Sequence, residues 1–261
     1  MKDVALITGA SRGIGFELAL LFAQQRIDVV IVAHDSQKLL DARKAIASNS
    51  SVKVHAVAAD LSTIEGTDVV RNYIDENNLR VKYLVNNAGF GDYGPFIERN
   101  METYSRMIRL NIEGLTALTY TYARDMVRNG NGRILNVAST AGYQPDPHFA
   151  VYGATKAYVV NFTEALHKEL SDTGVTATVL SPGATRTDFI SRADMLNAKL
   201  YDSGVMSAKD VALAGFRAMM SGKLYVIPGF KNRFMTFLSG VTPSRRLLLE
   251  VSARIMSQRT T

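Results

Sequence analysis

The chain has 261 residues, of which 47% are hydrophobic and 21% are charged, as in ordinary globular proteins. It has no cysteine, which excludes disulfides, thiol nucleophiles and cysteine-ligated zinc and fits a reducing cytosol. Its net charge of +6 comes mostly from the segment after Phe230, where six basic residues accompany one acid, so the nearly neutral remainder gives no sign of a nucleic-acid-binding patch.

No apolar run approaches the roughly 20 residues that a membrane-spanning helix needs. Residues 4–8 already read as a strand, which leaves no room for the charged and apolar parts of a signal peptide. We therefore expect a cytoplasmic protein without nucleic-acid partners and without a metal site, whose contact with a membrane is at most peripheral.

Short apolar segments alternate with segments of helical spacing as far as residue 227. The strands are expected at Val4–Thr8, Asp28–Ala33, Val52–Ala58, Lys82–Val85, Gly132–Ala138, Val175–Leu180 and Leu224–Ile227. The helices are expected at about 13–26, 36–48, 64–78, 101–129, 150–171 and 208–221. This order predicts an α/β fold, a doubly wound parallel sheet of about seven strands with helices on both faces. No repeat or linker divides the chain, so we expect a single domain.

A glycine-rich turn follows the first expected strand, where residues 8–15 read TGASRGIG. Its glycines permit a tight turn and a close approach of the backbone to a phosphate, and the helix that begins there offers unpaired N–H groups. The spacing is not G-x-G-x-x-G, so a turn without a ligand is the alternative. The residues expected to bind a dinucleotide here are Gly9, Ser11, Arg12, Gly13, Ile14 and Gly15.

The end of the second strand bears on the choice between NAD and NADP. Enzymes that prefer NAD often carry an acid there, which binds the ribose 2′-hydroxyl. Ala33 holds that position here, and Arg12 and His34 supply cations for a 2′-phosphate. We therefore expect NADP(H), with NAD as the alternative if Asp35 takes the position of the acid.

Polar residues follow the next two strands. Asp60 and Leu61 end the third strand and suit an adenine amino group, while Asn87, Ala88 and Gly89 end the fourth, where the backbone meets a cofactor. Because Asp and Asn are also common in caps and turns, each of them alone is better explained by a structural role.

Tyr152 and Lys156 are four residues apart in the segment YGATK, which places both side chains on one face of a helix. A lysine ammonium near a phenol lowers the pKa of the tyrosine from about 10 and makes it able to exchange a proton near neutral pH. Ser139 ends the preceding apolar strand and would reach the same substrate oxygen. An amphipathic helix with a surface lysine is the alternative.

Taken together, these motifs resemble those of the short-chain dehydrogenase/reductase family. The order and spacing agree from residue 4 to about residue 190, roughly 70% of the chain. The matching positions are T-G-x-x-x-G-x-G at 8–15, Asp60, N-N-A-G at 86–89, Asn111, Ser139, Y-x-x-x-K at 152–156, Pro182-Gly183 and Thr187.

The resemblance implies a Rossmann-like fold and a role for each matching residue. Tyr152 would be the general acid in reduction and the base in oxidation, and Lys156 would lower its pKa and hold the nicotinamide ribose. Ser139 would hydrogen-bond the substrate carbonyl, and Asn111 would hold a water that links Lys156 to solvent.

Three further residues would fix the nicotinamide, namely Pro182, Gly183 and Thr187. The resemblance also implies an oxidoreductase that interconverts a ketone and a secondary alcohol, and a homodimer or homotetramer that pairs through the helices 101–129 and 150–171. On this interpretation residues 1–230 form the dinucleotide-binding and catalytic domain, with a substrate lid at about 185–206, and residues 231–261 extend it.

Apolar residues dominate the expected substrate cleft, which predicts a lipophilic ketone such as a 3-oxoacyl or steroid-like compound. His148 lies in the loop beside the cleft, where contact with substrate and simple exposure are both open. In the expected lid the apolar residues are Phe189, Ile190, Met195, Leu196, Leu200, Tyr201 and Val205. The aromatic residues expected to flank the cleft are Phe90, Tyr93, Phe96, Tyr143 and Phe149.

The extension after Pro243 places Leu248, Val251 and Ile255 on one helical face. We expect this face to pack on the protein body or on a partner subunit, and a basic amphipathic helix on an anionic membrane is the alternative. Such an extension is similar to that of reductases acting on lipid-like ketones. Two other functions stay open: a cofactor-binding sensor or scaffold without turnover, and a membrane-surface protein led by the tail.

Overall fold

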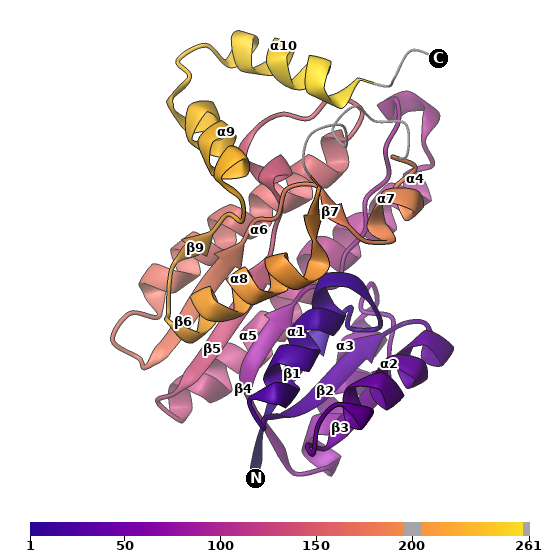
Figure 1. Cartoon of the computed structure of the whole chain (residues 1–261), viewed down its shortest axis with the longest axis vertical. Coiled ribbons are helices and arrows are strands. Elements are labelled where there is room, and N and C mark those ends of the chain that lie inside the picture. The colour runs from indigo at the N-terminus through magenta and orange to yellow at the C-terminus, as the bar shows by residue number, and fades with distance from the viewer. Residues whose placement is uncertain (196–204, 258–261) are drawn as a thin grey trace.

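A seven-stranded, wholly parallel sheet forms the centre of the computed structural model, which describes residues 1–195 and 205–257 (Figure 1). The strand order is β3-β2-β1-β4-β5-β6-β9. The strands are β1 (Lys2–Thr8), β2 (Asp28–Ala33), β3 (Val54–Ala58), β4 (Leu79–Asn86), β5 (Gly132–Val137), β6 (Val175–Leu180) and β9 (Tyr225–Val226). The predicted doubly wound sheet is confirmed.

Both faces of the sheet are covered by helices, which explains why the strands are apolar throughout. Ala5 and Ile7 of β1 pack into one core with α1 (Gly13–Gln24), α2 (Ser36–Ser48) and α8 (Ala208–Met220). Val4 and Leu6, which point to the opposite face, pack against α3 (Ile64–Glu76) and α5 (Leu115–Arg128). The helix α6 (Ala150–Glu169) covers the same side beside β6.

The predicted single helix 101–129 is interrupted by one wide turn. The segment is built from α4 (Met101–Ile108), a π-helical turn (Arg109–Gly114) and α5. At the end of that turn the backbone approaches a neighbouring loop closely, because a Cβ on Gly114 would lie 2.3 Å from the Leu61 carbonyl oxygen. Periodicity did not reveal this insertion, and π-turns of this kind are frequent at functional sites.

Several short elements follow the sixth strand. The strands β7 (Thr185–Arg186) and β8 (Met206–Ser207) pair in parallel, and α7 (Phe189–Arg192) lies between them. Sequence patterns missed all three, because two-residue strands and one-turn helices carry no readable period. Of the apolar residues expected in the lid, Leu196, Leu200 and Tyr201 lie outside the described residues.

The C-terminal extension forms two helices, α9 (Phe230–Val241) and α10 (Arg245–Met256), at the end of the molecule opposite the N-terminus (Figure 1). The predicted packing of α10 on the body is observed, and the predicted face is right for Leu248 but wrong for Val251. The helix buries Leu248, Ser252 and Met256, whereas Val251 is 38% exposed. The buried residues are spaced four apart, and the Ser252 hydroxyl donates a hydrogen bond to Asp146 Oδ1.

Candidate active site

A cavity of about 510 Å³ opens at the carboxyl ends of the central strands, where parallel sheets hold their ligands. It brings together nearly all of the residues predicted from the sequence, and the exceptions are Gly15 and Asn111. The predicted residues that line it are Gly9, Ser11, Arg12, Gly13, Ile14, His34, Asp60, Leu61, Asn87, Ala88, Gly89, Ser139, Tyr152, Lys156, Pro182, Gly183 and Thr187.

The glycine-rich turn is packed tightly against the loop after β4. Gly9 has φ of +65°, and a Cβ on it would lie 2.8 Å from Asn87 Nδ2. A Cβ on Gly15 would come within 2.4 Å of the same atom, so this glycine serves packing and does not face the cavity. The Asn87 side chain donates to the Thr8 carbonyl at 2.9 Å and thereby holds the turn open.

The N-terminus of α1 faces the cavity through Gly13 and Ile14. Arg12 stands at the N-cap and no side chain caps the first turn, which also contains no acid. Free N–H groups with the positive end of the helix dipole suit an anion. The turn and this helix end therefore fit the pyrophosphate of a dinucleotide.

The end of β2 carries no free acid toward the cavity. Asp35 instead caps α2, because its side chain accepts from the Lys38 N–H at 3.1 Å and pairs with Lys38 Nζ at 2.7 Å. Ala33 and His34 line the cavity, whereas Asp35 does not. The register that would have made Asp35 the ribose-binding acid is therefore not the one observed.

Arg12 connects the glycine-rich turn to the segment after β7. Its Nη1 lies 2.5 Å from Asp188 Oδ2, and the hydrogen bond from Arg12 lowers the pKa of the Asp188 carboxyl. Thr187 is close to the glycine turn as well, since a Cβ on Gly13 would lie 3.2 Å from its methyl group. The predicted phosphate cation is thus already paired with an exposed carboxylate.

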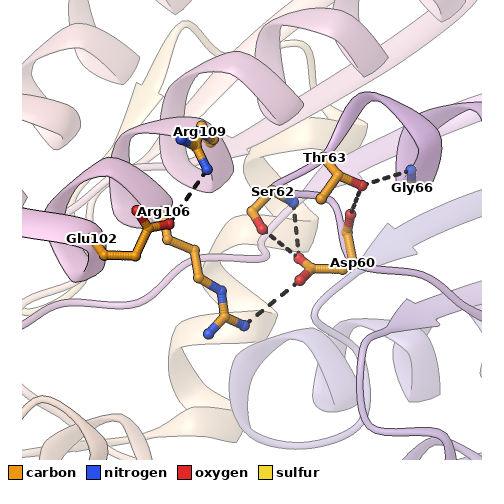
Figure 2. A network of polar contacts seen from close by, with 7 residues as sticks. All are labelled: Asp60, Ser62, Thr63, Gly66, Glu102, Arg106 and Arg109. Carbon is orange, nitrogen blue, oxygen red and sulfur yellow. Dashed lines mark hydrogen bonds and ion pairs between the residues drawn. The ribbon is translucent and has the colours of Figure 1, made fainter.

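Asp60 sits at the end of β3 in the network that Figure 2 shows. Its carboxylate accepts from the Ser62 N–H at 3.0 Å and from the Ser62 hydroxyl at 2.7 Å, and Arg106 lies 3.7 Å away. Burial alone would raise the pKa of Asp60, but these hydrogen bonds and Arg106 hold it below its usual range. Arg106, which sequence reasoning missed, also lines the cavity and packs over the Phe90 ring.

The reactive groups lie at the other end of the cavity. Tyr152 and Lys156 come from successive turns of α6, with Lys156 Nζ 5.6 Å from the centre of the Tyr152 ring. Lys156 is buried and donates to the Val137 carbonyl at 2.8 Å, and burial lowers its pKa to about 8. Ser139 follows β5 and lines the same cavity.

Asn111 lies behind this group in the π-turn and is almost fully buried. Its amide donates to the Phe90 carbonyl and to the Thr155 hydroxyl, each at 3.0 Å, and its oxygen accepts from the Phe90 N–H. Gly89 leaves space between Asn111 and Lys156, since a Cβ on Gly89 would lie 2.9 Å from Asn111 Oδ1 and 3.5 Å from Lys156 Nζ. The part of Asn111 in proton supply stays a prediction.

The wall beside Tyr152 is aromatic and apolar. Phe149 stacks on the Tyr152 ring at 4.2 Å between centres, and Phe189 lies 5.4 Å away on another side. Of the aromatic residues expected to flank the cleft, Phe90 and Phe149 line it, but Tyr93, Phe96 and Tyr143 do not. His148 is exposed and does not line the cavity, and its contact with substrate stays untested.

One carboxyl near this wall was not among the residues predicted from the sequence. Asp146 is 95% buried, lines the cavity, and accepts from Gln144 at 3.1 Å and from Ser252 of α10 at 3.2 Å. Its Oδ2 has no hydrogen-bond partner among the described residues. Burial raises the pKa of Asp146 to about 6. An aspartate between two prolines looks like a turn residue, so the sequence carried no signal for it.

This pKa predicts how stability changes with pH. A carboxyl whose pKa rises from 3.8 to about 6 on folding destabilises the folded state when ionised, and the penalty is relieved as pH falls through 6 toward 4. We expect Asp146→Asn to remove this titration, so the difference in unfolding free energy between variant and parent should change by about 2 kcal/mol between pH 7 and pH 4. Urea unfolding at several pH values measures it.

Asp75, an exposed carboxyl on α3, provides the matched control. The variant Asp75→Asn should follow the parent's pH profile of stability. A constant difference between Asp146→Asn and the parent across this range would show that the buried carboxyl does not titrate there.

Residues 3–195 match the family described as short chain dehydrogenase. A 3-oxoacyl-[acyl-carrier-protein] reductase of Synechocystis sp. is 34% identical over 198 residues, 76% of this chain and 78% of that protein. A solved short-chain dehydrogenase from Sphingobium yanoikuyae in complex with NADPH has a TM-score of 0.82 and 32% identity, covering 96% of both chains. The bulky-bulky ketone specific alcohol dehydrogenase from Comamonas testosteroni has a TM-score of 0.77 and 27% identity, covering 94% of this chain and 96% of that one.

Proposed function

Since the chain belongs to the short-chain dehydrogenase family, we propose that it is an NADP(H)-dependent reductase of a lipophilic ketone. Membership makes it an NAD(P)-dependent oxidoreductase that acts on CH–OH groups. The observation that best supports the proposed reductase is one cavity lined both by the glycine-rich turn and by Ser139, Tyr152 and Lys156.

In the proposed mechanism the bound nicotinamide supplies the hydride. Tyr152 donates its phenolic proton to the carbonyl oxygen of the substrate as that oxygen gains negative charge. Ser139 donates a hydrogen bond to the same oxygen and stabilises the charge before the proton arrives. In the direction of oxidation the same two groups act in reverse, with the phenolate of Tyr152 accepting the proton.

Lys156 acts through Tyr152. An ammonium one helical turn away favours phenolate over phenol, so the tyrosine becomes a better acid. Its bond to the Val137 carbonyl fixes the position of the ammonium against the end of β5. The amide oxygen and the amide nitrogen of Asn111 both bond the backbone of Phe90 in the loop after β4. Asn111 is proposed to supply protons to Lys156 through the space beside Gly89.

The preference for NADP(H) rests on charge at the end of β2. Ala33 offers no carboxylate to a ribose, and Asp35 is committed to capping α2. His34 and Arg12 line the cavity nearby and are the groups proposed to receive a 2′-phosphate. The related Sphingobium protein was solved with NADPH, which supports the same choice.

The substrate class follows from the wall around Tyr152. Besides Phe149 and Phe189, Met195 and Met256 line the cavity, so this end offers mainly apolar contacts. We propose a bulky lipophilic ketone, either 3-oxoacyl or steroid-like. The names of two relatives, a 3-oxoacyl reductase and an alcohol dehydrogenase specific for bulky-bulky ketones, support this class.

A panel of ketones tests the substrate class. We expect kcat/KM with NADPH to be at least about tenfold higher for a 3-oxodecanoyl ester or a steroid ketone than for acetoin, because each buried methylene contributes roughly 0.8 kcal/mol. Loss of NADPH absorbance measures turnover. Turnover confined to small polar ketones would contradict the proposed class.

The chain is also proposed to form a homodimer or homotetramer through α5 and α6. Tyr120 and Val127 on α5 and Tyr158 on α6 are apolar or aromatic side chains exposed on these helices. Pairing with a second copy would remove this surface from water.

A further inference from the structure

The helix α9 has its polar and apolar faces reversed relative to a helix that packs on a protein core. Its buried residues are Thr236 and Ser239, and its large apolar residues face outward. We propose that α9 and α10 dock the protein on an anionic membrane surface. This proposal goes beyond the reductase function. None of the helices in the described part of the chain is long and apolar enough to cross a bilayer, so the contact would be peripheral.

The outward residues of α9 form one continuous stripe. Phe230, Phe234, Phe237 and Val241 are 84%, 52%, 64% and 56% exposed. At 100° per residue they fall within about 60° of one another around the helix axis. A stripe of three phenylalanines on the outside of a protein is unusual unless something covers it. On α10, Leu247 and Val251 are exposed on one side as well.

Both helices of the extension carry cations. Lys231 and Arg233 lie on either side of it in the first turn of α9, and Arg245, Arg246 and Arg254 belong to α10, against the single acid Glu250. None of the five cations forms an ion pair with any residue in 1–195 or 205–257. Long basic side chains beside an apolar stripe reach the headgroups while the stripe enters the acyl boundary.

Charge favours a membrane over a second copy as the occupant. A symmetric pair would place the same patch against itself, so five cations would face five cations with one acid on each side. Like charges at an interface oppose association. An anionic leaflet attracts basic residues near its surface.

The surface lies directly behind the substrate end of the cavity. Met256 of α10 lines the cavity, and its carbonyl accepts a hydrogen bond from Tyr93, while Ser252 bonds Asp146. On α9, Asn232 packs against Gly183 of the cofactor wall. The same two helices therefore face the membrane on one side and the cavity on the other. If the substrate is lipophilic, as proposed above, it would reach the cavity from the bilayer.

Vesicle co-sedimentation of the full chain tests the docking. We expect binding to phosphatidylcholine vesicles that contain about 30% phosphatidylglycerol, and at least about tenfold weaker binding to phosphatidylcholine alone. The double variants Phe234→Gln/Phe237→Gln and Arg245→Gln/Arg246→Gln should each weaken binding to the anionic vesicles at least about tenfold. Exposed residues elsewhere serve as matched controls, Ile64→Gln/Ile97→Gln for the apolar pair and Arg43→Gln/Lys44→Gln for the basic pair, and these should bind as the parent does.

Equal sedimentation with anionic and neutral vesicles, or equal loss in the control variants, would overturn the proposal. A second result would also overturn it: the parent forms a dimer in light scattering and binds no vesicles, and Phe234→Gln/Phe237→Gln dissociates that dimer. The stripe would then contact a second copy of the chain. Turnover measured without vesicles separates this inference from the reductase function. Intact turnover without vesicle binding refutes only the docking, and vesicle binding without turnover refutes only the reductase.

Discussion

Replacement of Tyr152 by phenylalanine is expected to lower kcat for ketone reduction by at least two orders of magnitude. The substitution removes only the phenolic hydroxyl, and general acid catalysis is typically worth 10²- to 10⁴-fold. The ring that stacks on Phe149 is kept, so the wall of the cavity should be unchanged. NADPH affinity should fall by no more than about tenfold, since at most one hydrogen bond to the cofactor is lost. Steady-state kinetics and fluorescence titration with NADPH separate the two effects.

Tyr158 on the same helix is the matched control. Its hydroxyl lies 3.0 Å from Thr116 Oγ1 and does not line the cavity, so Tyr158→Phe should keep the parent kcat within about twofold. If Tyr152→Phe retained more than a tenth of the parent's kcat, another group would have to be the proton donor.

Placing a carboxylate at the end of β2 should reverse the choice of cofactor. Ala33 lines the cavity where an acid would meet the ribose 2′-position. We expect Ala33→Asp to lower the ratio of kcat/KM for NADPH to that for NADH about a hundredfold. Two like charges about 4 Å apart repel by several kcal/mol near a protein surface, while a ribose hydroxyl gains a hydrogen bond. The measurement is kcat/KM with each cofactor at saturating ketone.

The variant Ala33→Asn has the same shape without the charge and is the control. It should change the ratio by less than about tenfold, because an amide repels no phosphate. A parent enzyme with higher kcat/KM for NADH, or equal ratios for the two variants, would show that His34 and Arg12 do not select a 2′-phosphate.

The cofactor half of the site was readable because its residues follow buried strands. Runs such as Asp28–Ala33 are apolar throughout, which identifies strands covered on both faces, and the polar residues that follow must then meet at one edge of the sheet. The pair Tyr152 and Lys156 was readable for a similar reason, since a spacing of four fixes a shared face on any helix. Both inferences depend only on local geometry.

The features that were missed depend on contacts between distant segments. The pKa of Asp146 is raised by burial in the folded chain, where α10 brings Ser252 against it from 106 positions away, although the hydrogen bond from Ser252 itself lowers that pKa. Asn111 in the π-turn bonds the loop at Phe90, and Ser252 on the buried face of α10 bonds Asp146, both across long stretches of sequence. A single-sequence pattern contains none of these partners. Asp35 shows the converse, since the sequence allowed it to be the ribose-binding acid and its bond to Lys38 shows that it caps α2 instead.

The family match ends at residue 195, whereas Met256, which closes the substrate end of the cavity, belongs to α10. The substrate end of the cavity therefore draws on two separate stretches of the chain, since Phe149 and Phe189 lie within the matched region. Exchanging α9 and α10 between two such enzymes should shift the range of ketones accepted only in part, while Ser139, Tyr152 and Lys156 stay with the recipient. For enzyme engineering, residues 230–256 and the wall beside Tyr152 are the parts to diversify together.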